Sequence, residues 1–378
     1  MEFFPELMGE ILSRSLQARE LSEKLIRPTI AKDDETSRFP REIFESFGKA
    51  GIVGQLLPKE FSGSGDSFSS YYPSIDEVAQ ASVCFAVVIG VTNLVMGGIL
   101  KYGNPEQKKN YLPKLAQGEW LGAFSLSEPN AGSDASGLSL QARKVDKGYR
   151  LTGTKCWCSN AGYADLYLVM GRTSPDKKKG ITSFLVKKDT PGFKVGKHEH
   201  KLGLKSSSLG ELIFEDCFVP DADVLGKEGQ GFEVALSQLE SGRIGIATCG
   251  LGAATRSLDV IFPIRAKMKD PETGSDGVLD SLSEYYARLL ALKSLMHTTI
   301  QLKDAGKSKA VLASSLKLLA TDLAMEVSSF ALGNLPLEKQ AERIELERIF
   351  RDSKALQIVE GTNQIQKVVI AREMEKQK

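Results

Sequence analysis

Glu360 is the residue of this sequence whose surroundings point most directly to chemistry. It stands in IVEGTNQIQ, residues 358–366, between an apolar Ile-Val pair and a Gly-Thr break. A carboxylate among apolar groups loses solvation, so its pKa rises towards neutral pH and it becomes a usable general base. We expect Gly361 to end one helix and Thr362 to cap the next, which would hold the carboxylate rigidly. The alternative is that Glu360 only caps or solvates this junction.

Two further stretches have the composition of ligand-binding loops. AFSLSEPNAGSDASG, residues 123–137, combines a strand, a Glu-Pro turn and several hydroxyls. This suits a backbone loop that wraps an anion or a planar heterocycle, although a solvated loop between strands is the alternative. KCWCSNAGYAD, residues 155–165, brings Trp157, Ser159 and Asn160 to what we expect to be a second edge of the same sheet. There the indole could lie against a cofactor ring.

Three other patterns are better explained without a site. Gly250-Leu251-Gly252 resembles the start of a dinucleotide fingerprint, but no strand precedes it, so close helix packing is the preferred interpretation. His198 and His200 lack acidic ligands at a suitable spacing, so we expect no metal site. Cys156 and Cys158 are one residue apart, not two, and are expected to be buried small side chains and not a redox pair.

Composition excludes several classes of function. A chain of 378 residues exceeds one hydrophobic core, so two or three domains are expected. A net charge of +1 gives no electrostatic reason to expect nucleic acid or an anionic membrane as a partner. We expect no signal peptide and no apolar run of membrane-spanning length. The five scattered cysteines predict a cytoplasmic protein without a disulfide framework.

Apolar periodicity divides the chain into three zones. Residues 1–119 show helical spacing and predict an N-terminal helical domain. Residues 120–227 change to a period of two, with turn residues between short runs, and predict an antiparallel β-barrel or sandwich. Residues 228–378 return to helical spacing and predict a C-terminal helical bundle. Within them, residues 269–277 are expected to form an exposed, flexible loop. The fold class is therefore α+β with several domains.

Four motifs together resemble the acyl-CoA dehydrogenase family: SLSEPNAGSD, KCWCSNAGYADLY, SGRIGIA and RDSKALQIVEGTNQIQKVVIAR, in this order and at these separations. The similarity spans essentially the whole chain. The family's fold, with an N-terminal helical domain, a middle β-domain and a C-terminal four-helix bundle, is similar to the order of zones. The resemblance implies FAD as cofactor and an acyl-CoA thioester as substrate, with dehydrogenation between Cα and Cβ. It is closest in pattern to the short- and medium-chain branches, because the position that supplies the base in some members is Gly242 here.

The matching motifs also imply contacts for individual residues. Glu360 corresponds to the base that takes the α-proton while a hydride leaves Cβ for the flavin. The residues implied at FAD are Phe124, Ser127, Ser133, Trp157, Ser159, Thr362 and Gln364. The residues implied at the thioester and its coenzyme A are Ser133, Glu240, Arg243, Gly361 and Arg372. A guanidinium at position 243 also suits a phosphate-bearing ligand physically.

Two stretches depart from the family pattern. Relatives have Arg-x-x-Phe-Gly after the GRIGIA helix, whereas this chain lacks it, and Pro263 is expected to interrupt the helix. Relatives also have Gln-x-x-Gly-Gly-x-Gly before the final Arg-Asp, where this chain has Pro336 and Leu337 in place of the glycines. Both differences affect the contacts between subunits that hold the adenosine half of FAD.

Three explanations of these departures stay open. The chain could be a self-sufficient dehydrogenase, as a homodimer or homotetramer, or one subunit of a hetero-oligomer whose partner supplies the missing contacts. It could also be a non-catalytic relative that binds acyl-CoA or an acyl carrier. The resemblance implies an electron-transfer flavoprotein as electron acceptor. Val359 replaces an aromatic residue common in relatives, which predicts a wider pocket and a branched, cyclic or aryl-substituted acyl group.

Overall fold

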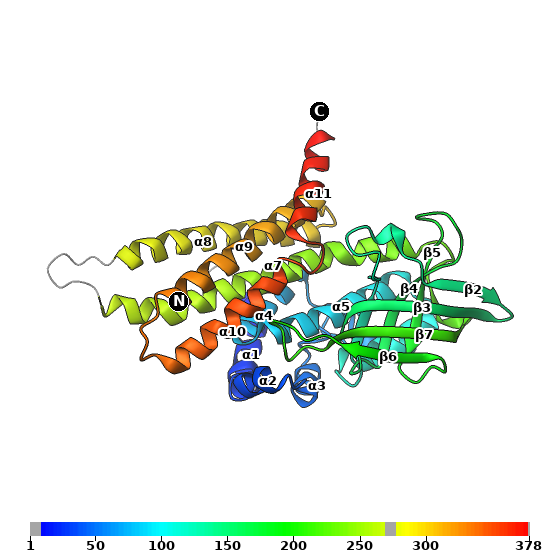
Figure 1. The fold of residues 1–378 in the computed structure, drawn as a ribbon, viewed down its shortest axis with the longest axis horizontal. Coiled ribbons are helices and arrows are strands. Elements are labelled where there is room, and N and C mark those ends of the chain that lie inside the picture. Colours follow the sequence, from blue (N-terminus) through cyan, green and yellow to red (C-terminus); the bar gives the residue numbers. More distant parts are fainter. Residues whose placement is uncertain (1–8, 269–276, 377–378) are drawn as a thin grey trace.

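Figure 1 shows the computed structural model of the chain, which describes residues 9–268 and 277–376. Helices fill one end of the molecule and a β-sheet the other, and α5 and α7 reach from the helical end towards the sheet. The helices are α1 Gly9–Leu21, α2 Ile30–Thr36, α3 Arg41–Lys49, α4 Phe68–Ala81, α5 Val83–Tyr102, α6 Pro105–Ala116, α7 Gly231–Ala266, α8 Gly277–Asp304, α9 Ala310–Gly333, α10 Gln340–Leu356 and α11 Asn363–Glu375. The loop expected at residues 269–277 lies outside the described residues except for its last residue, which begins α8.

The helix α5 is the apolar centre of the N-terminal domain. Ser82 caps it by accepting a hydrogen bond from the backbone N–H of Phe85 at 3.1 Å, and most of its residues are buried. Both α5 and α7 are long and apolar enough to cross a membrane, so the expectation that no run reaches that length is wrong. In each helix 78% of the apolar window is buried inside the protein, which is the behaviour of a core helix.

The middle domain is one eight-stranded sheet, and its main path runs β6-β7-β3-β2-β4-β5-β8 with β1 beside β4. The strands are β1 Gly122–Ser125, β2 Gln141–Val145, β3 Gly148–Ser159, β4 Leu166–Arg172, β5 Ile181–Lys187, β6 Phe193–His198, β7 Leu209–Pro220 and β8 Val224–Leu225. Most pairings are antiparallel, but β1 and β2 each pair with β4 in parallel. Alternate side chains, including Leu151, Phe184 and Phe214, form a separate core enclosed by the sheet.

The C-terminal helices α7 to α10 pack side by side, with α9 in contact with all the others. A Cβ at Gly250 would lie 2.9 Å from Ala320 O, and a Cβ at Gly252 would lie 2.6 Å from Ala79 Cβ, which confirms the interpretation of these glycines as close helix contacts. The expected interruption at Pro263 is wrong. The helix α7 continues to Ala266, because Pro263 lies in its last turn and removes only one hydrogen bond there.

Candidate active site

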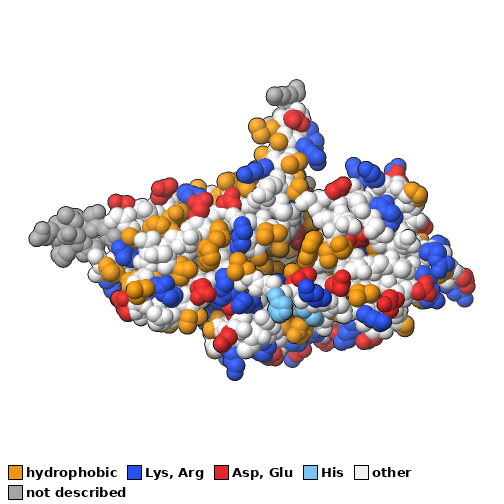
Figure 2. All heavy atoms as spheres, in the orientation of Figure 1, with side chains coloured by type: hydrophobic (Ala, Val, Ile, Leu, Met, Phe, Trp, Pro, Cys, Tyr) orange, Lys and Arg blue, Asp and Glu red, His pale blue; other side chains and the backbone are white. Residues whose placement is uncertain are grey.

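A cavity of about 1240 Å³ lies where α5, α7, the sheet and the junction between α10 and α11 meet. Figure 2 shows the surface hollowed between the helical body and the β-domain, near the base of the projecting helix α11. Apolar side chains make up most of the wall, which suits an organic ligand fixed by a few polar groups.

Most of the residues predicted from the sequence meet in this cavity. Those in its wall are Phe124, Ser127, Ser133, Trp157, Ser159, Arg243, Glu360, Gly361, Thr362 and Arg372. Two predicted residues are not in the wall. The carboxylate of Glu240 accepts a hydrogen bond from the Ser308 hydroxyl, and Gln364 is an exposed residue of α11.

The backbone around Glu360 adopts an unusual conformation. Glu360 has φ +55° and Gly361 has φ +85°, so two successive residues are left-handed, which is costly for the glutamate. The Gln366 amide donates to Glu360 O at 3.2 Å and Gly361 O at 2.8 Å and thereby fixes this turn. Thr362 caps α11 as predicted, accepting from the backbone N–H of Ile365 at 3.3 Å. The expected helix end at Gly361 is wrong, because α10 already ends at Leu356 and a turn separates the two helices.

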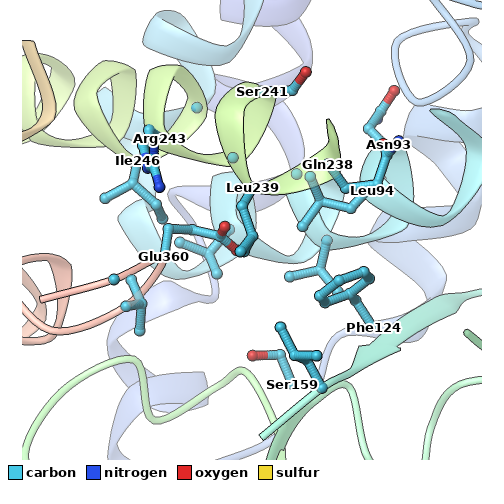
Figure 3. A pocket seen from close by; sticks show the side chains of 18 of the residues that line it. Asn93, Leu94, Phe124, Ser159, Gln238, Leu239, Ser241, Arg243, Ile246 and Glu360 are labelled. Carbon is cyan, nitrogen blue, oxygen red and sulfur yellow. The ribbon is translucent and has the colours of Figure 1, made fainter. Parts of the chain in front are cut away.

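The carboxylate of Glu360 lies between the cavity and α7. Its Oε2 is buried and has no hydrogen-bond partner among the described residues. A Cβ at Gly242 would overlap this oxygen and would lie 2.6 Å from Glu360 Cδ, so the glycine makes room for the carboxylate. Figure 3 shows the carboxylate beside Leu239, with Phe124 and Ser159 across the open space. Glu360 therefore lines the cavity while one of its oxygens is enclosed against α7 without a hydrogen bond, so the carboxylate is poorly solvated beside the space for a ligand.

Burial raises the pKa of Glu360 to about 7, and the positive charges of Arg243 and Lys317 limit the rise. Arg243 is itself poorly satisfied. Its Nε is buried and has no partner in the part of the chain that the structure describes, and its Nη1 lies 3.5 Å from Ser314 Oγ. Burial lowers the pKa of the guanidinium. A strongly perturbed acid and an incompletely paired cation in one cavity are typical of a functional site.

Lys317 is a site residue that the sequence reading missed. It is fully buried on α9, and its Nζ donates to Gly361 O at 3.0 Å and to Asn363 Oδ1 at 2.8 Å. Burial lowers the pKa of this ammonium to about 8. A sequence signal did exist, since residue 317 falls on the same helical face as Ala313, Ala320 and Ala324, where a lysine is out of place.

The opposite wall is anchored by a buried ion pair. Lys155 of β3 is fully buried, and its Nζ donates to Glu128 Oε1 at 2.8 Å and to Leu126 O at 3.0 Å. Glu128 also accepts from the backbone N–H groups of Ser139 at 2.6 Å and Leu140 at 2.9 Å. These bonds tie both ends of the loop that carries Ser127 and Ser133 to the sheet. The loop is therefore a fixed surface, which favours the ligand-binding interpretation over a solvated loop.

Trp157 presents an unusually exposed indole to the cavity. Its φ is +52°, it lies where the β3–β7 pairing shifts register between Lys155 and Cys158, and 52% of the residue is exposed. The bulge turns the side chain out of the sheet. As a whole strand β3 lies between β7 and β2, but its pairing with β2 covers only residues 148–152, so residues 155–159 pair within the sheet with β7 alone. Asn160 is buried and donates to Gly122 O at 2.8 Å, which is a structural contact.

These features fit a large organic ligand with a flat ring and anionic groups. The exposed indole provides a flat apolar surface, the anchored loop presents hydroxyls, and Lys201, Lys354 and Arg372 supply positive charge around the cavity. Within the described ranges there is no group of three or more His, Cys, Asp or Glu residues placed to hold a metal ion. The site thus has the donors that an anionic organic ligand needs.

Comparison with known proteins identifies the family. Models of the acyl-CoA dehydrogenase N-terminal, middle and C-terminal domains match residues 15–119, 123–217 and 229–375. The chain belongs to the acyl-CoA dehydrogenase family. It is therefore an oxidoreductase that acts on CH–CH groups and belongs to a family of FAD proteins.

Three relatives illustrate how closely the family resembles this chain. An acyl-CoA dehydrogenase of Bacillus subtilis is 37% identical over 96% of this chain and 97% of its own length. The butyryl-CoA dehydrogenase structure from Megasphaera elsdenii superposes with a TM-score of 0.91, at 33% identity and with 99% of this chain and 100% of that chain covered. A structure described as the electron transferring flavoprotein of Acidaminococcus fermentans superposes with a TM-score of 0.93, at 32% identity and with 99% of both chains covered. The three-domain fold expected from the sequence is thus confirmed.

Proposed function

We propose that this chain dehydrogenates an acyl-CoA thioester between Cα and Cβ, with Glu360 as the base that removes the α-proton. The observation that carries the proposal is the Glu360 side chain, which lines a cavity large enough for thioester and cofactor, has one oxygen buried without a partner among the described residues, and has a carboxyl pKa of about 7. A carboxylate with this pKa is ionised in a useful fraction at neutral pH and accepts a proton more readily than one in water.

The side chains around Glu360 prepare it for this step. Arg243 and Lys317 keep part of the carboxyl ionised despite its burial, and the apolar Leu239 side chain lies beside it. The Cα–H bond electrons form the new double bond and its proton passes to Glu360. FAD, when bound, supplies the acceptor for the hydride that leaves Cβ. We assign the cofactor to the wall formed by Trp157 and the anchored loop, and the thioester to the space between that wall and Glu360.

The test is a comparison of Glu360→Gln with the wild type. We expect the variant to bind acyl-CoA but to bleach the flavin at least about 100-fold more slowly under anaerobic conditions, since positioned bases contribute this much. In the wild type kcat/KM should fall as pH drops below about 7, because the base becomes protonated. Glu240→Gln is the matched control, since Glu240 is outside the cavity wall. Equal flavin reduction by wild type and Glu360→Gln would exclude Glu360 as the base.

We further propose a homodimer or homotetramer that retains FAD by itself. The helix α11 projects from the body, and its Val368 and Met374 are exposed apolar side chains of the kind that a neighbouring subunit covers. A hetero-oligomer is the alternative that the sequence departures leave open. Molar mass and flavin content of the purified chain separate the two, because only a chain that needs a partner would be isolated free of FAD and bind it after mixing.

Two further proposals concern the electron acceptor and the cellular compartment. An electron-transfer flavoprotein is proposed as acceptor because one similar structure bears that name. All five cysteines are free thiols, which agrees with a reducing cytoplasm. A retained, unpartnered carboxylate in the cavity argues against a non-catalytic binding protein, since such an oxygen is costly to keep without use.

A further inference from the structure

The helices α5 and α7 form the apolar end of the cavity. On α5 the wall residues include Val87, Gly90, Leu94 and Gly97, which recur at helical spacing and so share one face. On α7 the corresponding face carries Leu239, Gly242, Gly245 and Ile246. Two facing helical stripes therefore bound a slot, and what the slot accepts depends on the side chains that these stripes carry.

The register between the two helices follows from two contacts. Tyr102 Oη of α5 lies 3.2 Å from Glu233 Oε1 of α7, and a Cβ at Gly97 would lie 2.7 Å from Gln238 Oε1. The contact nearer the end of α5 involves the earlier residue of α7, so the helices run antiparallel. Seven residues further along each helix from the Gly97 and Gln238 contact, or about 10 Å, the chain reaches Gly90 on α5 and Gly245 on α7. The two glycines are therefore level with each other.

Gly90 and Gly245 differ from the packed glycines of the same helices. A Cβ added at either would find no heavy atom of the described residues within 4 Å, whereas one at Gly242 would overlap Glu360 and one at Gly252 would press on Ala79. Both open glycines line the cavity and are partly exposed within helices that are otherwise largely buried. Helix packing therefore does not require a glycine at either position. Their effect is to leave room in the cavity, although glycine inside a helix is less stabilising than alanine.

The widened level lies one helical turn from Glu360. Gly242, which touches the Glu360 carboxylate, is one turn before Gly245 on α7, so the glycine pair lies about 5 Å further along the slot. The nearest wall residues there are apolar, namely Val87, Val91 and Ile246. Val359, next to the base, is also small and lines the same cavity. An acyl group would thus meet a slot that broadens one turn from Glu360 and whose wall is mainly apolar, with Arg243 as a charged wall residue nearby.

We propose that Gly90 and Gly245 determine specificity and that the acyl group of the substrate is branched or carries a ring beyond the reacting carbons. The inference rests on the dehydrogenase function proposed above. A straight chain is too thin to touch both walls at the glycine level, and its unfilled flanks lose dispersion contacts. A phenyl or cyclohexyl group fills the width between the two helices and recovers those contacts. Selectivity should therefore follow the width of the acyl group and not its length.

The experiment measures kcat/KM for 3-phenylpropionyl-CoA, butyryl-CoA and octanoyl-CoA with an artificial electron acceptor. We expect the wild-type holoenzyme to prefer the phenyl substrate over both straight chains by about tenfold or more, in the range that pocket contacts provide. Gly90→Val and Gly245→Val should each reduce turnover of the phenyl substrate about tenfold and change butyryl-CoA less than about threefold. Gly333→Val is the matched control, since a Cβ there also meets open space but outside the cavity.

The outcomes distinguish failure of the specificity proposal from failure of the dehydrogenase proposal. A wild type that prefers octanoyl-CoA, or valine variants that slow all three substrates equally while Gly333→Val does not, would overturn the glycine assignment alone. Absence of turnover of any thioester by flavin-loaded protein would overturn both proposals. Circular dichroism and flavin content of each variant show whether it is folded. If a valine variant does not fold, Gly90→Ala and Gly245→Ala take its place, with a smaller loss in the same direction expected for the phenyl substrate.

Discussion

Replacing Lys317 with methionine tests whether a buried charge on a distant helix sets the basicity of Glu360. The Lys317 ammonium is fully buried, and its charge opposes the burial that raises the pKa of Glu360 to about 7. Methionine has a similar length and no charge, so it should fill the same space. We therefore expect the pKa of Glu360 in Lys317→Met to rise further, by on the order of one pH unit.

Lys317→Met should slow the enzyme most near neutral pH. At pH 7 a base with a pKa of about 7 is half ionised, whereas one with a pKa of about 8 is ionised to roughly one tenth. We therefore expect kcat/KM of Lys317→Met to be about fivefold lower at pH 7. At pH 9 the two enzymes should converge, because Glu360 is ionised in both. Lys317 itself, with its pKa lowered to about 8 by burial, is by then mostly neutral in the wild type.

The substitution also removes two hydrogen bonds. Gly361 O keeps its bond from Gln366 at 2.8 Å, and Asn363 Oδ1 still has the Thr321 hydroxyl as a donor at 3.2 Å, which it shares with Lys317 O at 2.9 Å. Neither acceptor is left without a donor, so we expect the free energy of unfolding to fall by only about 1–2 kcal/mol. Urea unfolding measures this loss. It is small enough for the variant to be studied as a folded enzyme.

The assay is flavin reduction by butyryl-CoA, followed anaerobically from pH 5.5 to 9.5. Lys317→Gln keeps a hydrogen-bond donor without the charge, and it should share the shifted acid limb of the pH profile. Lys303→Met is the matched control, because burial lowers the pKa of Lys303 too, but its carboxylate neighbours are Glu240 and Asp304. A Lys317→Met enzyme that is slower by the same factor at every pH would refute the electrostatic argument and leave only a positional role.

Three further outcomes are expected. The pKa of Glu360 is raised above its ordinary value, so the contribution of this carboxyl to stability is present below pH 4.5 and lost as pH rises through 7. In urea titrations Glu360→Gln should therefore increase the free energy of unfolding at pH 8 by up to about 3 kcal/mol and leave it unchanged at pH 4. Gly242→Ala adds a methyl group that overlaps the carboxylate, so kcat should fall about 100-fold, and a crystal structure should show Glu360 displaced. Glu128→Gln leaves buried Lys155 without its counter-charge and should cost about 3–5 kcal/mol of stability, with FAD lost on gel filtration.

The fold was predictable because each zone carries its own periodicity. The change to a period of two and back falls close to the first and last strands, β1 and β8, since alternate residues enter the core inside the sheet. The helix ends expected at Pro263 and Gly361 were wrong for the same reason. A proline or glycine indicates that a helix is disturbed nearby, but not at which residue its last turn ends. The place of β3 inside the sheet depends on long-range pairing, which periodicity does not report.

The site was predictable to the extent that its residues lie in contiguous motifs. Glu360, Trp157 and the hydroxyls of the loop were recognisable because each motif keeps its own composition, and the structure brings them to one cavity. Glu240 and Gln364 share motifs with true wall residues but lie on other faces of their helices. A motif places a segment near a ligand, whereas helical geometry decides which of its side chains reach it.

The residues that set the chemistry of Glu360 were hidden for a further reason, because each is ordinary in its own segment. A glycine at 242 resembles any small residue in a packed helix, and a lysine at 317 resembles any helical lysine. Only the packing of α7 and α9 against the left-handed turn places the space at Gly242 and the charge of Lys317 beside the Glu360 carboxylate. The position and the pKa of the Glu360 carboxyl therefore depend on three segments of the chain. It follows that changes at residues 242 and 317 should alter where the base sits and how it titrates while the IVEGTNQIQ stretch stays intact.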